Sequence, residues 1–128
     1  MAEKYNINLI GKEGYMSEEE YWCNIMKSDI ILLPYRKIFG GNSGPMTDGV
    51  YFNKFIIGPS GGNIEYLINK YDLGLVFDVE NSESLAKILS KILDVDLNKE
   101  NDYKNNLTVN KFIENHEILY NKIIRIGK

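Results

Sequence analysis

Short apolar runs alternate with segments of helical periodicity along most of this chain. Residues 30–33, 55–57 and 74–77 are continuous apolar runs, as expected of strands that are covered on both faces of a sheet. Polar and apolar residues alternate over residues 5–10, and this stretch ends in an apolar pair before Gly11, which predicts a further strand. Because strands and helices alternate, we predict an α/β fold with a parallel sheet of about four strands and helices on both faces.

Capping residues and apolar spacing predict where the helices begin. Ser17 and Glu20 form a capping-box pattern, and the helix that follows places Tyr21 and Ile25 on one side. Pro45 suits the first turn of a second helix, because its missing N–H is harmless there. Polar residues with little periodicity cover 94–106, where we expect mobility. The predicted helices after the first cover residues 44–52, 63–71, 82 to about 92 and, as a C-terminal extension, about 108–126.

Length and composition indicate one soluble domain, residues 1–128. The net charge is −3 with scattered Lys and Arg, which excludes a basic footprint for nucleic acid. Cys23 and His116 are each the sole residue of their type, so a disulfide, a multi-histidine metal site and a Ser–His–Asp arrangement are not expected. The start of the chain lacks the apolar core of a secretory signal, and no apolar run has bilayer length. We therefore expect a cytoplasmic protein.

Two glycine-rich turns each follow a predicted strand and precede a predicted helix. Their sequences are GGNSG at residues 40–44 and GPSGG at residues 58–62. Such turns let backbone N–H groups approach an anion at the positive end of a helix. The carboxyl ends of parallel strands share one edge of a sheet, so both turns predict a phosphorylated ligand at that edge.

Residues of the first turn have a functional and a structural interpretation. Ser43 could donate its hydroxyl and N–H to a phosphate that Gly44 lets approach closely. Local sequence favours the simpler interpretation, in which Ser43 caps the helix, and the two are compatible. Asp48 lies one helical turn further on, where its carboxylate could accept both hydroxyls of a ribose. The alternative for Asp48 is a solvated surface acid.

Other candidates lie at the same predicted edge. Tyr35 and Arg36 follow the second predicted strand, and Arg36 could pair bidentately with phosphate or be an ordinary loop charge. Glu65 lies in the first turn after Gly61 and Gly62, where an acid is favourable whatever the function.

Aromatic and sulfur-containing residues near the first helix have mainly structural interpretations. Tyr15 and Met16 precede that helix and could border a flat base, but a core or rim position for Tyr15 is at least as consistent. Trp22 and Cys23 are assigned to packing, and His116 to an exposed or partly packed position on the last helix.

An ordered series of motifs resembles the C-terminal half of GT-B glycosyltransferases of the GT4 type, over about residues 5–93. Residues 14–20 (GYMSEEE) and 28–36 (SDIILLPYR) are similar to the family's G-y-v-s-x-e-e and a-D-v-v-l-l-P-Y-r runs. The remaining matches are SGPMTDG at 43–49 to S-G-x-x-x-E-A, NKFIIG at 53–58 to G-K-P-V-I-g, GGNIE at 61–65 to G-G-x-x-E and GLVF at 74–77 to G-l-v-f.

The resemblance implies a Rossmann-like domain that binds a nucleotide diphosphate sugar. In that family the S-G turn holds the diphosphate, which would fall to Ser43 and Gly44. The acid that follows binds ribose hydroxyls, which would fall to Asp48, and the G-y-v segment lines the base pocket, which would fall to Tyr15 and Met16. The family usually requires no metal, so we expect neither metal nor cofactor.

Departures from the family pattern bear on activity. The ribose-binding acid is the shorter Asp48, the position of the family's second acid is Gly40, and Gly49 replaces Ala at a cost to the helix of about 1 kcal/mol. The family's phosphate-binding Arg and Lys and its acceptor domain have no counterpart. We therefore expect a fragment, a truncated product or one subunit of a split enzyme, with little turnover by this chain alone.

The leading hypothesis is the donor-binding domain of a glycosyltransferase for polysaccharide biosynthesis. It would transfer a hexosyl group to an acceptor glycan or lipid-linked sugar, with Gly61, Gly62 and Glu65 shaping the sugar side. Expected partners are an acceptor domain or partner chain, which could attach it to the inner membrane, or a second copy meeting at an exposed apolar surface. The alternative is a non-catalytic binding module or partner subunit. A flavodoxin-like or receiver-like module is disfavoured, because residues 11–13 offer one acid only.

Overall fold

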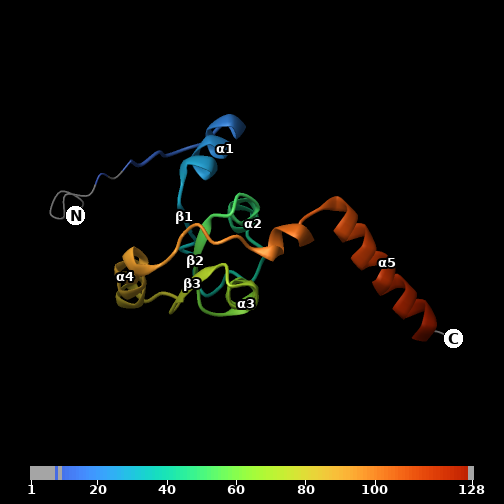
Figure 1. Cartoon of the computed structure of the whole chain (residues 1–128). Helices are drawn as coiled ribbons and strands as arrows, with labels where there is room; N and C mark the ends of the chain where they lie inside the picture. The colour runs from blue at the N-terminus through green and yellow to red at the C-terminus, as the bar shows by residue number, and fades with distance from the viewer. Residues whose placement is uncertain (1–7, 9, 127–128) are drawn as a thin grey trace.

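Three parallel strands form the centre of the fold (Figure 1). The computed structural model describes residue 8 and residues 10–126. Strands β1 (Ile30–Leu32), β2 (Phe55–Pro59) and β3 (Gly74–Phe77) lie in the order β1-β2-β3, with every pairing parallel. This open α/β sheet is consistent with a Rossmann-like arrangement.

The number of strands differs from the prediction. We predicted about four strands, and the described residues contain three. The expected strand at residues 5–10 lies mostly outside the described residues. Asn8 and Ile10, which are described, have no strand conformation, so a fourth strand is not part of the described sheet.

Helices occupy the predicted positions before, between and after the strands. The stretch 94–106, for which we expected mobility, carries a short 3-10 helix whose Tyr103 packs against the core. The helical elements are α1 (Glu18–Lys27), α2 (Gly44–Tyr51), α3 (Gly62–Tyr71), α4 (Ser82–Lys91), η2 (Ile92–Asp94), η3 (Asp102–Asn106) and α5 (Val109–Ile126).

The main core lies between one face of the sheet and helices α2 and α3. Ile56 of β2 and Val50 of α2 are both wholly buried. Burial of such a side chain stabilises the fold by about 1.5–3 kcal/mol, so these two side chains strongly favour the packing of α2 against the sheet. The complete cluster is Ile25, Ile31, Leu33, Met46, Val50, Ile56, Ile64, Ile68 and Leu73.

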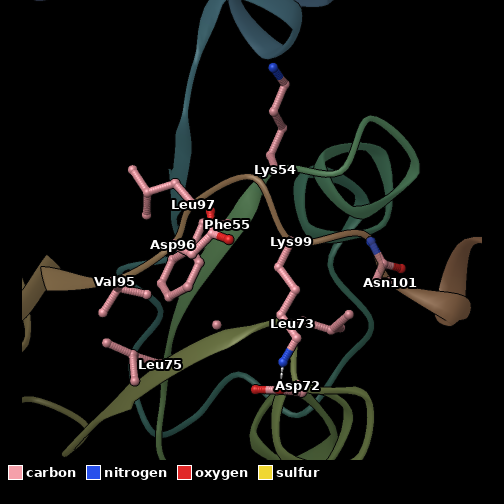
Figure 2. Close-up of a pocket in the computed structure, with 11 residues that line it drawn as sticks. Lys54, Phe55, Asp72, Leu73, Leu75, Val95, Asp96, Leu97, Lys99 and Asn101 are labelled. Carbon is pink, nitrogen blue, oxygen red and sulfur yellow. Dashed lines mark ion pairs between the residues drawn. The ribbon is translucent and has the colours of Figure 1, made fainter.

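The opposite face of the sheet is covered by α4 and by the segment that follows η2. Ile57 and Phe77 are buried on this side, because successive strand residues point to opposite faces. Phe77 borders a pocket with Leu85 of α4. Figure 2 shows residues 95–101 crossing the amino ends of β2 and β3, where they enclose an apolar pocket of about 270 Å³. Helices therefore lie on both faces, as predicted.

Two glycines allow unusually close contacts around β2. A Cβ atom on Gly49 would lie 2.7 Å from Cγ1 of Ile31, so the missing side chain lets α2 pack directly on the sheet. A Cβ atom on Gly74 would lie 1.8 Å from the carbonyl oxygen of Ile56. Gly49, which we expected mainly to weaken its helix, thus has a packing role.

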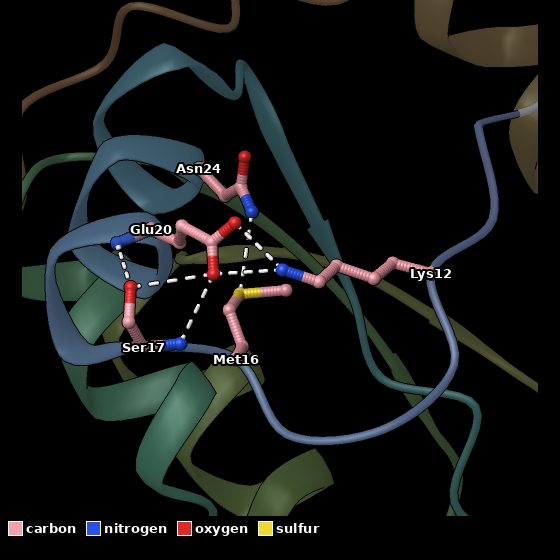
Figure 3. Close-up of polar contacts among 5 residues, drawn as sticks. All are labelled: Lys12, Met16, Ser17, Glu20 and Asn24. Carbon is pink, nitrogen blue, oxygen red and sulfur yellow. Dashed lines mark hydrogen bonds and ion pairs between the residues drawn. The ribbon is translucent and has the colours of Figure 1, made fainter.

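The predicted capping box at the start of α1 is confirmed (Figure 3). The backbone N–H of Glu20 donates to the Ser17 hydroxyl at 3.2 Å, and the Ser17 N–H donates to Glu20 Oε2 at 3.1 Å. Lys12 pairs with the same carboxylate at 2.6 Å. The hydrogen bond from Lys12, followed by that from Ser17, lowers the pKa of Glu20.

Helix α5 projects away from the sheet and contacts η3 (Figure 1). Its apolar side chains are exposed along the helix; they include Phe112, Ile113, Ile118, Leu119, Tyr120, Ile123, Ile124 and Ile126. Among the helices of the described residues, none has the length and hydropathy needed to cross a membrane.

Candidate functional site

The N-termini of α2 and α3 meet at the carboxyl edge of the sheet. Helix α2 follows β1 and helix α3 follows β2, and because the strands are parallel both helices begin at the same edge. The Asn63 side-chain amide donates to Oδ1 of Asn42 at 2.6 Å and ties the two glycine-rich turns together. The two turns predicted to bind an anion are therefore neighbours.

Two clefts open beside these turns. The first, here called the glycine cleft, measures about 430 Å³ and lies between residues 36–41 and residues 59–64. The second, the serine cleft, measures about 350 Å³ and is lined by Ser43, Asn63 and Tyr103 among others. Asn63 borders both clefts, so a ligand of two linked groups could extend from one cleft to the other.

Ser43 caps α2, as local sequence favoured. Its hydroxyl accepts the N–H of Met46 at 3.1 Å and lies 3.1 Å from the Tyr35 hydroxyl. The residue is 4% exposed. If Tyr35 donates to it, the Ser43 hydroxyl keeps its own proton for an anion, so capping and anion binding are chemically compatible here.

The first turn of α2 leaves the Gly44 backbone amide without a partner among the described contacts, although Gly44 lines neither cleft. Pro45 has no N–H, and the N–H of Met46 donates to Ser43. Thr47 donates its N–H to the Ser43 carbonyl at 3.1 Å. Within the described contacts, the Gly44 N–H thus has no acceptor, which fits the role expected for it.

Asp48 faces α1 and lines neither cleft. Its Oδ2 accepts a hydrogen bond from the Tyr21 hydroxyl at 2.6 Å. Burial, followed by this hydrogen bond, raises the pKa of Tyr21 to about 12. The Asp48 side chain is half-buried and partnered, in contrast to a freely solvated surface acid.

Arg36 and Tyr35 follow β1 directly, at the edge predicted for them. Arg36 lines the glycine cleft, and its Nε lies 3.8 Å from Glu80 in an exposed pair. Exposed pairs contribute little stability, so the guanidinium can turn toward an anion at small cost. The Tyr35 ring stacks on Phe39 with centroids 4.0 Å apart, and Phe39 forms part of the cleft wall.

The first turn of α3 already holds a carboxylate. The N–H of Gly61 donates to Oε2 of Glu65 at 2.6 Å. Gly61 and Gly62 have φ angles of 93° and 68°, which favour glycine. Because Glu65 places negative charge at this helix end, a hydroxyl-bearing group is better suited to it than a phosphate.

The residues expected at a base pocket lie outside both clefts. Tyr15 is fully exposed, and the Asn24 amide donates to the Met16 sulfur at 3.3 Å. Both residues immediately precede α1, whose first turns carry Tyr21. A base-binding role for Tyr15 and Met16 stays a prediction.

Three contributors to this region have no local sequence signal. Tyr21 reads as a core-facing helix residue, yet its hydroxyl reaches Asp48. Asn42 reads as a turn residue and Asn63 as the start of a helix, yet the two side chains hydrogen-bond to each other. All of these contacts join residues that are distant in sequence, so periodicity and turn composition could not indicate them.

No group of three or more His, Cys, Asp and Glu side chains in the described part of the chain is arranged to hold a metal ion. Comparison of the chain with protein-family models, with curated proteins and with solved structures gave no match. Function is therefore inferred from the geometry of the site.

Proposed function

We propose that this chain is the donor-binding part of a glycosyltransferase that uses a nucleotide diphosphate sugar. The observation that carries the proposal is the meeting of the α2 and α3 N-termini at one sheet edge, fixed by the Asn42–Asn63 hydrogen bond. In open parallel sheets this edge is where ligands bind.

Local geometry supplies the attraction for a diphosphate. A helix N-terminus carries partial positive charge and unpaired N–H groups, and the α2 end supplies these to the diphosphate, since the α3 end already holds the Glu65 carboxylate. Arg36 and Lys37 add positive side chains at the glycine cleft. The chain as a whole has a net charge of −3, so this attraction must come from the local arrangement and not from the overall field.

Each candidate residue has a role in this proposal. Gly44 and Ser43 bind the diphosphate and stabilise it as the leaving group when the hexosyl bond breaks. Asp48 accepts a ribose hydroxyl, while Tyr15 and Met16 border the base.

The remaining part of the proposal concerns the transferred sugar. Gly61, Gly62 and Glu65 face the hexosyl group, since Glu65 can accept its hydroxyls. The acceptor, a glycan or lipid-linked sugar, is presented by a further domain or by a partner chain. The reaction as proposed needs no metal or cofactor from this chain.

Calorimetric titration with UDP, GDP and ADP tests the proposal. We expect one of the three to bind with a Kd of about 1 mM or tighter, equivalent to about 4 kcal/mol. Ser43→Ala and Asp48→Ala should weaken that binding, whereas Ser90→Ala on α4 and Asp94→Ala on η2 serve as matched controls away from the clefts. Absence of binding by the folded wild-type chain would overturn the proposal. Binding that both site variants leave unchanged would overturn the site assignment.

A second candidate function is a non-catalytic binding module or partner subunit. It is favoured by the contacts that Ser43, Asp48 and Glu65 already make within the chain. Polar groups that are satisfied before binding gain less from a ligand, because a hydrogen bond must be exchanged and not simply added. Incubation of the chain with UDP-, GDP- and ADP-hexoses separates the two candidate functions. If the chain hydrolyses the bond between hexose and diphosphate faster than buffer alone does, the non-catalytic candidate is contradicted.

A further inference from the structure

The hydrogen bond between Tyr21 and Asp48 joins the first turn of α1 to the middle of α2. Its length of 2.6 Å is that of a strong bond between a hydroxyl and a carboxylate. Both side chains are half-buried, and α1 and α2 pack against each other. The contact therefore belongs to a formed interface between two helices.

Aromatic packing fixes the Tyr21 ring. Trp22 meets it edge-on, with ring centroids 5.3 Å apart at 72°, and Trp22 in turn meets Phe52 at 6.0 Å and 64°. Tyr21 itself packs against the main core. A hydroxyl on a ring held in this way has little freedom, so it can hold the group to which it donates.

We propose that Tyr21 is a positioning residue that orients the Asp48 carboxylate for one ribose hydroxyl of the nucleotide. The proposal rests on the proposed function, because it requires a nucleotide at this edge. Donation to Oδ2 fixes the rotation of the carboxylate and leaves Oδ1 for the ligand. Because an aspartate side chain is short, the oxygen that meets the ligand must be aimed accurately.

A purely structural contact between α1 and α2 is the competing explanation. Loss of such a contact would lower stability and weaken every ligand to the same extent. Loss of a positioning contact would instead reduce the preference for the nucleotide that carries the hydroxyl. The ratio of the affinities for ribose and deoxyribose forms therefore distinguishes the two explanations.

The experiment measures this ratio in the full chain. The tightest binder among UDP, GDP and ADP is compared with its 2′-deoxy and 3′-deoxy forms. A hydrogen bond to a charged group is worth about 1.5 kcal/mol or more, so the wild type should bind the ribose form about tenfold more tightly than one deoxy form. Asp48→Asn should bring the ratio close to one.

Tyr21→Phe is the decisive variant. We expect it to reduce the ratio to about threefold or less, while affinity for the deoxy form changes by less than about twofold. The double variant with Asp48→Asn should lose nothing further. Tyr66→Phe on α3, whose hydroxyl contacts Lys70 at an exposed site, is the matched control and should keep the wild-type ratio.

Trp22→Phe is the second variant, used if Tyr21→Phe does not fold. It loosens the Tyr21 ring but keeps the hydroxyl, and its ratio should fall between those of the wild type and Asp48→Asn. If folded Tyr21→Phe keeps the wild-type ratio of ribose to deoxyribose affinity, the positioning role is overturned and the proposed function still stands. If Tyr21→Phe does not fold, a wild-type ratio in Trp22→Phe has the same meaning. A folded wild type that binds none of the three nucleotides would overturn both.

Discussion

Tyr21 and Asp48 share a hydrogen bond of 2.6 Å that ties α1 to α2. Because burial and this bond raise the Tyr21 pKa from 10.0 to about 12, the folded state favours the neutral phenol. The stability that this supplies is complete below about pH 10 and is lost as the pH rises from there toward 12. We expect Tyr21→Phe to show a smaller loss of unfolding free energy over this range than the wild type. Urea unfolding at several alkaline pH values measures this loss of unfolding free energy, with Tyr66→Phe as the control. Equal losses in Tyr21→Phe and the wild type would contradict the prediction.

Gly49→Ala should destabilise the protein although alanine favours helices. Helix propensity alone would stabilise α2 by about 1 kcal/mol. The added Cβ would lie 2.7 Å from Ile31 and 3.2 Å from Ile56, and overpacking of this kind costs about 1–3 kcal/mol. We therefore expect a lower unfolding free energy by chemical denaturation. Gly40→Ala, where the added Cβ meets nothing within 4 Å, is the control; a stabilised Gly49→Ala would show that α2 can move away from the sheet.

The unfolding free energy lost when the Ser43 cap is removed should depend on which residue replaces Ser43. Ser43→Ala leaves the Met46 N–H without its acceptor and should cost about 1 kcal/mol of unfolding free energy, whereas Ser43→Gly should cost only a few tenths. Both variants lose the hydroxyl, so any effect of the hydroxyl on nucleotide binding should be the same in the two. Thermal unfolding and titration of the same samples separate these effects, and equal destabilisation would argue against a cap.

Acid should weaken the start of α1. The Lys12 and Ser17 contacts lower the pKa of Glu20, so the stability they supply is present above the ordinary glutamate pKa of 4.5 and is lost as the pH falls through the lowered value. Amide hydrogen exchange at residues 18–21 should therefore accelerate on acidification beyond its intrinsic pH dependence. Lys12→Ala should reduce that acceleration, while Lys27→Ala at the other end of α1 should leave it unchanged; identical behaviour of the two variants would contradict the prediction.

Local pattern predicted the elements of the fold well. The apolar runs at β1, β2 and β3 and the Ser17 capping box are local signals, and the structure confirms them. The turns at residues 40–44 and 58–62 were expected at one sheet edge because parallel strands must share it. Each of these inferences needs only neighbouring residues and a rule of topology.

Contacts between distant residues could not be predicted in the same way. The Tyr21–Asp48 bond and the Gly49–Ile31 contact depend on how closely α1, α2 and the sheet approach one another. Asn101, in a stretch expected to be mobile, donates to the Val50 carbonyl at 3.2 Å and fastens that stretch to α2. Such details arise from packing geometry, for which composition and periodicity carry no signal.

The order β1-β2-β3 also bears on how the chain folds. Each strand pairs with the next strand along the chain, and β2 takes part in both pairings, so each pairing in the described sheet spans one crossover helix. Parallel pairing across a crossover must close a loop before its contacts form, and this slows folding. We expect folding to begin around β2 and α3, so that Ile56→Val slows refolding more than it speeds unfolding, while Leu85→Ala on α4 does the reverse; stopped-flow kinetics would decide. On this view the sheet grows outward from its middle strand, and its two edges form last.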